Sequence, residues 1–435
     1  MPSTASGTIL RYPAKGSVVT SLLFRDRLLP PLPTGPLVDY NHAKRRRATQ
    51  EAGMKYRVVS TDDHLQEGKD SYLTRMSKRW GDLAPQVRPV GDGTEAWFIY
   101  GVKRQGAGGV GTVHGVMPDR TKPPERWADV PLKAYVPAER VKAMKEDGVD
   151  VHTFFGNIAG VAGNTFQVPE WPEEFREESI RAFNDFQIDA FAEPYPGRFI
   201  TLAIVPLWSA PRAIEEMQRM RKKGVKGVSF AFPQQFGYPH IVDKYWDPFW
   251  AAAQEADLSI NLHIGSGGSQ GVGLVGVGAY AGHNPMFQLA EASTKGISAN
   301  TQVMATILFS QITERFPRLK FVSSESGIGW VPYLLEVADH QWERQKLWNE
   351  GMKVKPSDYF HRQCYVNFWF EEVGILMRRF IGIDNIMWES DYPHPTCTYP
   401  DSQEYIRKVT KDLTPEERQK IMVDNAVRVF HLDGN

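Results

Sequence analysis

Cysteine is scarce in this 435-residue chain, which contains two, Cys364 and Cys397. Two cysteines cannot build a disulfide scaffold, and such low usage is typical of proteins that fold in a reducing cytosol. We therefore expect a cytoplasmic protein. Net charge is also lacking, because 51 Lys and Arg side chains balance 51 Asp and Glu side chains. This balance gives no indication of nucleic acid or a membrane surface as a partner.

Long apolar stretches and nucleotide-binding motifs are absent as well. No segment approaches the ~20 apolar residues that cross a bilayer, and the first residues lack the apolar core of a signal peptide. The glycine-rich residues 101–115 lack the Gly-Lys-Ser/Thr ending of a phosphate loop, and no helical pattern follows them. These absences argue against membrane proteins and phosphate-loop enzymes, and no G-x-G-x-x-G follows a predicted strand and opens a helix, which counts against dinucleotide-binding enzymes.

The chain has an irregular beginning and a more regular remainder. Residues 1–54 are rich in proline, glycine and basic side chains, and residues 28–37 (LLPPLPTGPL) cannot form regular structure. We expect an extended arm over 1–54 and a single barrel domain over 55–431. Within the domain, the weakly periodic residues 68–148 are interpreted as a long insertion after the first strand, forming a cap or an oligomer contact. Exchange of extended segments would make the protein a homodimer.

Strand and helix patterns alternate after the insertion. Short apolar runs that predict strands start near residues 56, 149, 199, 225, 258, 320, 365 and 386, and helical patterns separate most of them. Strands that alternate with helices pair in parallel through right-handed crossovers. The pattern therefore predicts an α/β fold, a (β/α)8 TIM-like barrel. An open doubly wound sheet is the alternative.

Side chains that can bind metal end several of these strands. The pattern is clearest in IMWESDYPHP, where an apolar run is followed by Asp391 and prolines then end the strand. The first strand ends in Asp62 and His64, which are two residues apart and share one face of an extended chain. His263 ends the strand near 258, and Glu325 ends the strand near 320.

The carboxyl ends of barrel strands meet at one face, so these five side chains are expected together. Carboxylates and imidazoles in this combination suit zinc, manganese or iron. The sequence therefore predicts one or two divalent metal ions, held by Asp62, His64, His263, Glu325 and Asp391. A helix cap is the alternative role for Asp391 taken alone.

Five segments together resemble the amidohydrolase superfamily, in the branch of metal-dependent TIM-barrel hydrolases and decarboxylases that includes aminocarboxymuconate-semialdehyde decarboxylase. They are STDDHLQE (60–67), YPGRFITLAIVPL (195–207), YWDPFWAAAQEADLSINLHIGSGG (245–268), FPRLKFVSSESGIGW (316–330) and NIMWESDYPHP (385–395). The resemblance covers about 55–431, apart from the middle of residues 68–148. It implies metal ligands at Asp62, His64, His263 and Asp391. It also implies an acid–base role for the carboxylate of the last strand or for a group on the strand near 320.

Glu325 is a departure from the branch that the chain resembles. Many members of that branch have histidine at the end of the corresponding strand. Binuclear members of the wider superfamily often use a carbamylated lysine on the fourth strand, and no lysine ends the strand near 225 in this chain. A two-metal site would need another bridge, for which Glu325 is the natural candidate. The additional carboxylates favour iron or manganese over a histidine-rich zinc site.

The motifs leave the reaction open. The preferred hypothesis is hydrolysis or non-oxidative decarboxylation of a small carboxylated or carbonyl-bearing substrate, with Glu325 or Asp391 moving a proton. The alternatives are a non-heme mono- or di-iron oxygenase for a bulky apolar substrate, and a binding protein that retains the barrel. His394 is a candidate for orienting a ligand or contacting substrate, and Trp330 is a candidate for the pocket rim.

Overall fold

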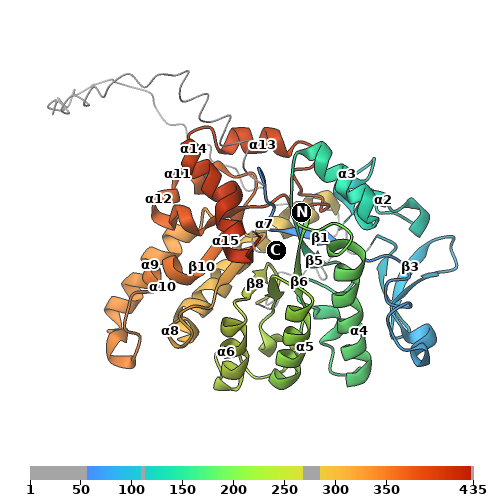
Figure 1. Cartoon of the computed structure of the whole chain (residues 1–435), viewed down its shortest axis with the longest axis horizontal. Helices are drawn as coiled ribbons and strands as arrows, with labels where there is room; N and C mark the ends of the chain where they lie inside the picture. The colour runs from blue at the N-terminus through green and yellow to red at the C-terminus, as the bar shows by residue number, and fades with distance from the viewer. Residues whose placement is uncertain (1–55, 109–112, 268–284, 433–435) are drawn as a thin grey trace, which may run out of the picture. The chain divides into compact units, whose positions relative to one another are not determined.

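The computed structural model describes residues 56–108, 113–267 and 285–432. The predicted arm, residues 1–54, lies outside this range. Eight parallel strands form one sheet in the order β1-β5-β6-β7-β8-β9-β10-β11 (Figure 1). Their bounds are β1 (Asp63–Leu65), β5 (His152–Gly156), β6 (Phe199–Ala203), β7 (Gly227–Ser229), β8 (Ser259–His263), β9 (Phe321–Ser324), β10 (Cys364–Phe368) and β11 (Ile386–Trp388).

The first and last strands of the sheet meet, which closes it into a barrel. Asp63 forms an isolated parallel bridge with Tyr392. The His64 amide donates to the Tyr392 carbonyl at 2.6 Å, and the Asp391 amide donates to the Asp62 carbonyl at 3.0 Å. The predicted (β/α)8 barrel is confirmed. We call this junction of β1 with the residues after β11 the seam.

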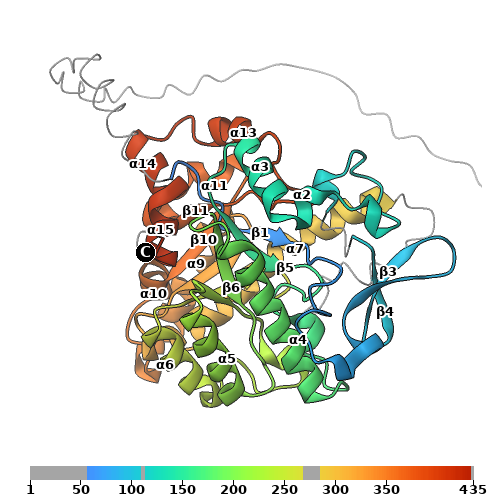
Figure 2. The same cartoon turned by 45° about the vertical axis from the view of Figure 1, so that its right-hand side comes forward.

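Helices cover the outside of the strands (Figures 1 and 2). Helix α5 (Ala210–Lys222) illustrates why, because Ala213, Met217 and Met220 recur at helical spacing and are all buried. The other helices around the barrel are α4 (Glu173–Phe186), α6 (Asp247–Glu255), α7 (Pro285–Phe309), α8 (Ile312–Arg315), α9 (Val331–Arg344), α10 (Pro356–Gln363), α11 (Glu372–Leu376), α12 (Arg378–Ile381), α13 (Ser402–Val409), α14 (Pro415–Gln419) and α15 (Asn425–Phe430). No helix among the described residues has the length and apolar character needed to cross a membrane.

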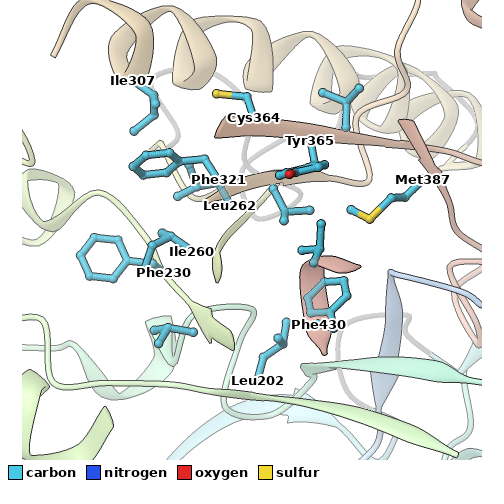
Figure 3. Close-up of a cluster of buried hydrophobic side chains, with 14 of the residues drawn as sticks. Leu202, Phe230, Ile260, Leu262, Ile307, Phe321, Cys364, Tyr365, Met387 and Phe430 are labelled. Carbon is cyan, nitrogen blue, oxygen red and sulfur yellow. The ribbon is translucent and has the colours of Figure 1, made fainter. Parts of the chain in front are cut away.

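A continuous apolar core joins the strands to the helices (Figure 3). Leu202, Leu262 and Phe321 come from β6, β8 and β9, whereas Ile307 comes from α7 and Phe430 from α15. All five side chains are fully buried. Burial of one such side chain contributes about 1.5–3 kcal/mol. This core fixes the strands, and therefore the positions of the residues at their ends.

The first strand begins later than the sequence predicts. The apolar run 56–60 contributes only an isolated bridge between Val59 and Val151. The Val59 amide instead donates to the Met422 carbonyl near the C-terminus, at 2.9 Å. Strand β1 then begins at Asp63. The predicted start was wrong because this run makes only the two hydrogen bonds of a single bridge, from the Ser60 amide to the Val151 carbonyl and from the Asp150 amide to the Val58 carbonyl, before the regular strand begins.

Residues 68–148, which the sequence predicts to be an insertion and which we call the insertion, are more regular than their sequence indicates. The insertion contains an antiparallel sheet of β2 (Gln86–Pro89), β3 (Glu95–Ile99) and β4 (Val102–Gly106), and the helices α2 (Leu132–Tyr135) and α3 (Pro137–Asp147). The sequence predicts only the middle strand, because the outer strands are short and polar. Trp97 on β3 is fully buried, and its indole donates to the Ala107 carbonyl at 3.2 Å. Figure 2 shows β3 and β4 on the side of the barrel where α2 lies.

Candidate metal centre

Six polar side chains meet where the barrel strands end. They are Asp62, His64, His263, Glu325, Asp391 and His394. The structure therefore brings together all five side chains that the sequence predicts as ligands. Asp62 precedes β1, His64 lies within it, and His263 ends β8. Glu325 follows β9, and Asp391 follows β11 after two intervening residues.

Two imidazole nitrogens lie at the centre of the cluster. Nε2 of His64 and Nε2 of His263 are 3.2 Å apart. Nδ1 of His263 lies 2.9 Å from the Ile264 carbonyl oxygen. Because a carbonyl oxygen can only accept, Nδ1 carries a proton, which leaves Nε2 as the ring nitrogen that could bind a metal ion. Ring nitrogens arranged in this way suit a shared cation.

Carboxylate oxygens surround these nitrogens. Asp62 lies 3.7 Å from Nε2 of His263 through Oδ2 and 4.0 Å from Nε2 of His64 through Oδ1. Oδ1 of Asp391 is 3.5 Å from Nε2 of His64, and Oε2 of Glu325 is 2.8 Å from Nε2 of His263. Both Asp62 oxygens and Oδ1 of Asp391 are buried without a hydrogen-bond donor. Such oxygens are costly unless a cation binds them, so the residues fit a divalent metal ion.

Burial and crowded charge shift the pKa values of Asp62, Asp391, His64 and Glu325. Burial raises the pKa values of Asp62 and Asp391 well above 3.8, and neighbouring carboxylates raise them further. Burial also lowers the pKa of His64, as do the imidazoles beside it. Burial raises the pKa of Glu325 too, but the charge and hydrogen bond of His263 and the charge of His394 together lower it below its ordinary value. A bound divalent cation favours ionised carboxylates and neutral imidazoles. Its charge would therefore offset the free-energy cost of burying three acidic side chains together.

The backbone is strained at two of the acids. Glu325 has a φ of 53° and Asp391 a φ of 59°, in the left-handed region that residues other than glycine seldom adopt. Hydrogen bonds hold both residues there. The Glu325 amide donates to Oε2 of Glu389 at 3.1 Å, and the Asp391 amide donates to the Asp62 carbonyl at 3.0 Å.

Sequence reasoning missed several groups that support the ligands. Glu389 is fully buried, and burial raises its pKa well above 4.5. It stands two residues before Asp391, so the same strand-end pattern could have identified it. Thr396 donates its hydroxyl to Oδ2 of Asp391 at 2.5 Å. No sequence pattern predicts that contact, because it depends on how the following loop folds back.

Asp63 faces away from the cluster, as the alternation along an extended chain predicts for a structural residue. Its Oδ2 accepts the Thr153 amide at 3.0 Å, and its Oδ1 accepts the Tyr392 amide at 3.2 Å and the Ser390 hydroxyl. Burial raises the Asp63 pKa to about 7, although nearby Arg140 opposes the shift. Asp63 therefore joins β5 to the segment that carries Asp391.

His394 lies in the cluster itself. Its Nδ1 is 3.5 Å from Oδ2 of Asp391 and 3.6 Å from Oε1 of Glu325, and its ring stacks on His64 at 4.3 Å between centroids. Its side chain is 16% exposed, that of Glu325 is 9% exposed and that of Asp391 is fully buried. Solvent therefore reaches the cluster on the side of His394 and Glu325.

Trp330 lies at the start of α9. It is half-buried, and its indole nitrogen donates to the Ser326 carbonyl at 2.9 Å. This contact holds the turn between β9 and α9. The predicted place of Trp330 at a pocket rim remains a prediction.

The family model described as "Amidohydrolase" matches residues 125–432. The chain belongs to this family. It is similar to gamma-resorcylate decarboxylase from Rhizobium radiobacter, with 24% identity over 318 residues that cover 68% of this chain and 87% of the relative. The predicted family is confirmed.

Solved structures agree on the fold. An amidohydrolase from Mycobacterium avium subsp. paratuberculosis has a TM-score of 0.66 at 22% identity, covering 87% of this chain and 100% of the other. A dihydroxybenzoic acid decarboxylase from Polaromonas sp. JS666, with bound manganese and the inhibitor 2-nitroresorcinol, has a TM-score of 0.58 at 18% identity, covering 87% and 98%. Family membership also confirms the prediction of a metal-dependent hydrolase or decarboxylase that uses a divalent metal.

Proposed function

We propose that this protein is a non-oxidative decarboxylase of small carboxylated ring compounds, with a divalent metal held by Asp62, His64, His263 and Asp391. The observation that carries the proposal is the pair of ring nitrogens 3.2 Å apart, bordered by Asp62 and Asp391 oxygens that lack hydrogen-bond donors. The similarity to gamma-resorcylate decarboxylase favours decarboxylation over hydrolysis.

A bound divalent ion would supply Lewis acidity at a substrate oxygen and would lower the pKa of bound water. The chain's own residues supply orientation and proton transfer. Substrate would approach past His394 and Glu325, since these are the cluster members that solvent reaches, at 16% and 9% side-chain exposure. His64 and His263 are almost completely buried, so water does not reach the cluster on their side.

Glu325 is the group to which we assign proton transfer. Its low pKa makes it a carboxylate at neutral pH, so it first accepts a proton from water or a substrate hydroxyl. The bond between the ring carbon and the carboxylate carbon breaks, CO2 leaves, and the ring carbon takes up the proton that Glu325 delivers. In the alternative hydrolysis, Glu325 would accept the proton of the attacking water.

The test is CO2 release from hydroxybenzoates, including γ-resorcylate, by protein reconstituted with Mn²⁺. We expect CO2 and the decarboxylated ring in equal amounts, and loss of both in Asp391→Asn. Hydrolysed product without CO2, from a panel of lactones and amides, would favour the hydrolase hypothesis instead. Oxygen uptake by iron-loaded protein would favour the oxygenase hypothesis instead.

A further inference from the structure

Arg140 is a buried cation beside the metal centre with no part in the reaction proposed above. It lies on α3, within the insertion, and its side chain is fully buried. Burying a guanidinium is costly unless hydrogen bonds and opposite charge compensate it. The partners that compensate Arg140 therefore indicate what the residue does.

The guanidinium of Arg140 spans the seam. Nη1 donates to the carbonyl of His64 at 2.9 Å, and Nη2 lies 3.5 Å from the carbonyl of Tyr392. The carbon Cζ lies 4.0 Å from the centroid of the Tyr392 ring. One planar group therefore contacts the backbone of a candidate ligand on β1 and the backbone of the residue that follows Asp391.

The same guanidinium also reaches β5. Its Nε donates to Nδ1 of His152 at 3.0 Å. Nε2 of that imidazole lies 3.9 Å from Oδ1 of Asp63, whose carboxylate binds the amides of Thr153 and Tyr392. Arg140, His152 and Asp63 thus form one buried network under the ligands. The network connects α3, β1, β5 and the segment after β11.

Backbone hydrogen bonds from the amides of Thr61, His64 and Asp391 cross the seam, and Arg140 adds side-chain donors to this short junction. Strands β8 and β9 are paired over four residues, and β10 and β11 over three. The seam has one isolated bridge, between Asp63 and Tyr392. A small shift there would separate His64 from Asp391, because these two residues lie on opposite sides of it.

Helix α3 is itself anchored, so Arg140 is presented from a fixed position. Asp147, at the end of α3, accepts the Ser402 amide at 3.0 Å and the Ser402 hydroxyl at 2.6 Å. Ser402 begins α13, which lies next to α3 in Figures 1 and 2.

We propose that Arg140 is a positioning residue for the metal centre, through which the insertion holds the seam in the arrangement that brings His64 and Asp391 together. This inference rests on the metal site of the proposed function. It assigns the insertion a role in metal binding, in addition to any role as a cap or an oligomer contact.

The test is Mn²⁺ binding to metal-free protein, measured by calorimetry and by the electron paramagnetic resonance spectrum of the bound ion. Arg140→Met keeps length but removes the donors, and we expect roughly 10- to 100-fold weaker binding with an altered spectrum. Arg140→Lys keeps the charge but cannot bond both carbonyls, so we expect an intermediate affinity. Arg379→Met, at an exposed arginine on α12, is the matched control and should bind like the wild type.

Wild-type Mn²⁺ affinity in folded Arg140→Met would overturn the inference. If that variant does not fold, Arg140→Lys decides, because wild-type affinity and an unchanged spectrum in the lysine variant would show that the fork of donors is not needed. The proposed function fails separately, if wild-type protein binds no Mn²⁺ or releases no CO2. Binding that is intact in the wild type but insensitive to both Arg140 variants rejects the positioning role alone.

Discussion

Gly115 packs directly against the backbone of His394. Its amide donates to the Pro393 carbonyl at 2.9 Å, and a β-carbon at position 115 would overlap the carbonyl oxygen of His394 and lie 2.5 Å from Sγ of Cys397. Gly115 belongs to the insertion, in the short 3-10 helix His114–Val116. The insertion thus contacts the loop that carries His394 and Thr396, on the solvent-accessible side of the cluster.

Gly115→Ala is therefore expected to displace that loop. Because His394 and Thr396 contact Asp391 and Glu325, we expect kcat to fall by roughly 10-fold or more, in line with the cost of small misplacements near reacting groups. The measurement is CO2 release at saturating Mn²⁺. Gly106→Ala is the control, since nothing lies within 4 Å of a β-carbon there. Equal loss in both variants would count against the contact.

Glu325→Gln tests the assignment of proton transfer. The amide keeps the shape of the side chain but cannot carry a proton, so we expect kcat to fall by roughly 10²- to 10⁴-fold. Mn²⁺ content, measured on the same samples, should stay close to that of wild type. Glu336→Gln changes an exposed carboxylate on α9 and should be silent. If activity per bound Mn²⁺ is unchanged, Glu325 is a ligand and another group moves the proton.

Glu67 gives a pH-dependent prediction outside the metal centre. Its carboxylate accepts the Ile158 and Ala159 amides at 2.9 Å each, and the Tyr72 hydroxyl at 3.3 Å. Burial raises its pKa from 4.5 to about 7. A raised folded-state pKa means that the stabilisation is fully present below the unfolded value near 4.5 and is lost as pH rises through about 7.

The expected loss is ~3 kcal/mol between these limits, at 1.36 kcal/mol per pKa unit. Glu67→Gln does not titrate, so the Tm of wild type minus that of the variant should decrease between about pH 5 and pH 8. Thermal unfolding of both proteins at each pH measures this difference. A difference that stays constant across the range would mean that the buried carboxyl keeps its ordinary pKa.

The barrel and most of the candidate ligands follow from local sequence. Asp391, Glu325 and His263 each follow or end an apolar run of strand length, and a barrel with parallel strands brings such ends together. Local sequence predicts these positions because the end of each strand coincides with the end of its apolar run. The prediction was weaker for β1, where the run 56–60 forms a single bridge to Val151 and the regular strand begins only at Asp63.

The supporting network could not be predicted, because it joins residues that no local pattern connects. Arg140 is 76 residues from His64, on a helix in a segment with weak periodicity. Its role depends on how α3 docks over the seam. His394 was visible in the motif after β11, but its contact with Glu325 depends on the fold of that loop. Long-range packing, which sequence pattern does not encode locally, decides both positions.

The last prediction concerns Asp62, which should stabilise the loaded protein and destabilise the metal-free one. Both of its oxygens are buried without donors, and burial with neighbouring carboxylates raises its pKa. In metal-free protein, Asp62→Asn removes this repulsion and adds a donor, so we expect Tm to rise by about 2–4 °C. With excess Mn²⁺ the order should reverse, because only wild type gains stability from tight binding.

Thermal unfolding in chelator and in Mn²⁺ measures both parts of the Asp62 prediction. Asp412→Asn removes an exposed carboxylate and should leave both Tm values unchanged. A lower Tm for Asp62→Asn in chelator would show that Asp62 has a structural partner in the metal-free state. An equal Mn²⁺-induced shift in the variant and the wild type would remove Asp62 from the ligand set. A cluster that is costly when empty and stabilising when filled is expected of residues placed for a cation, since packing alone would favour apolar side chains at these buried positions.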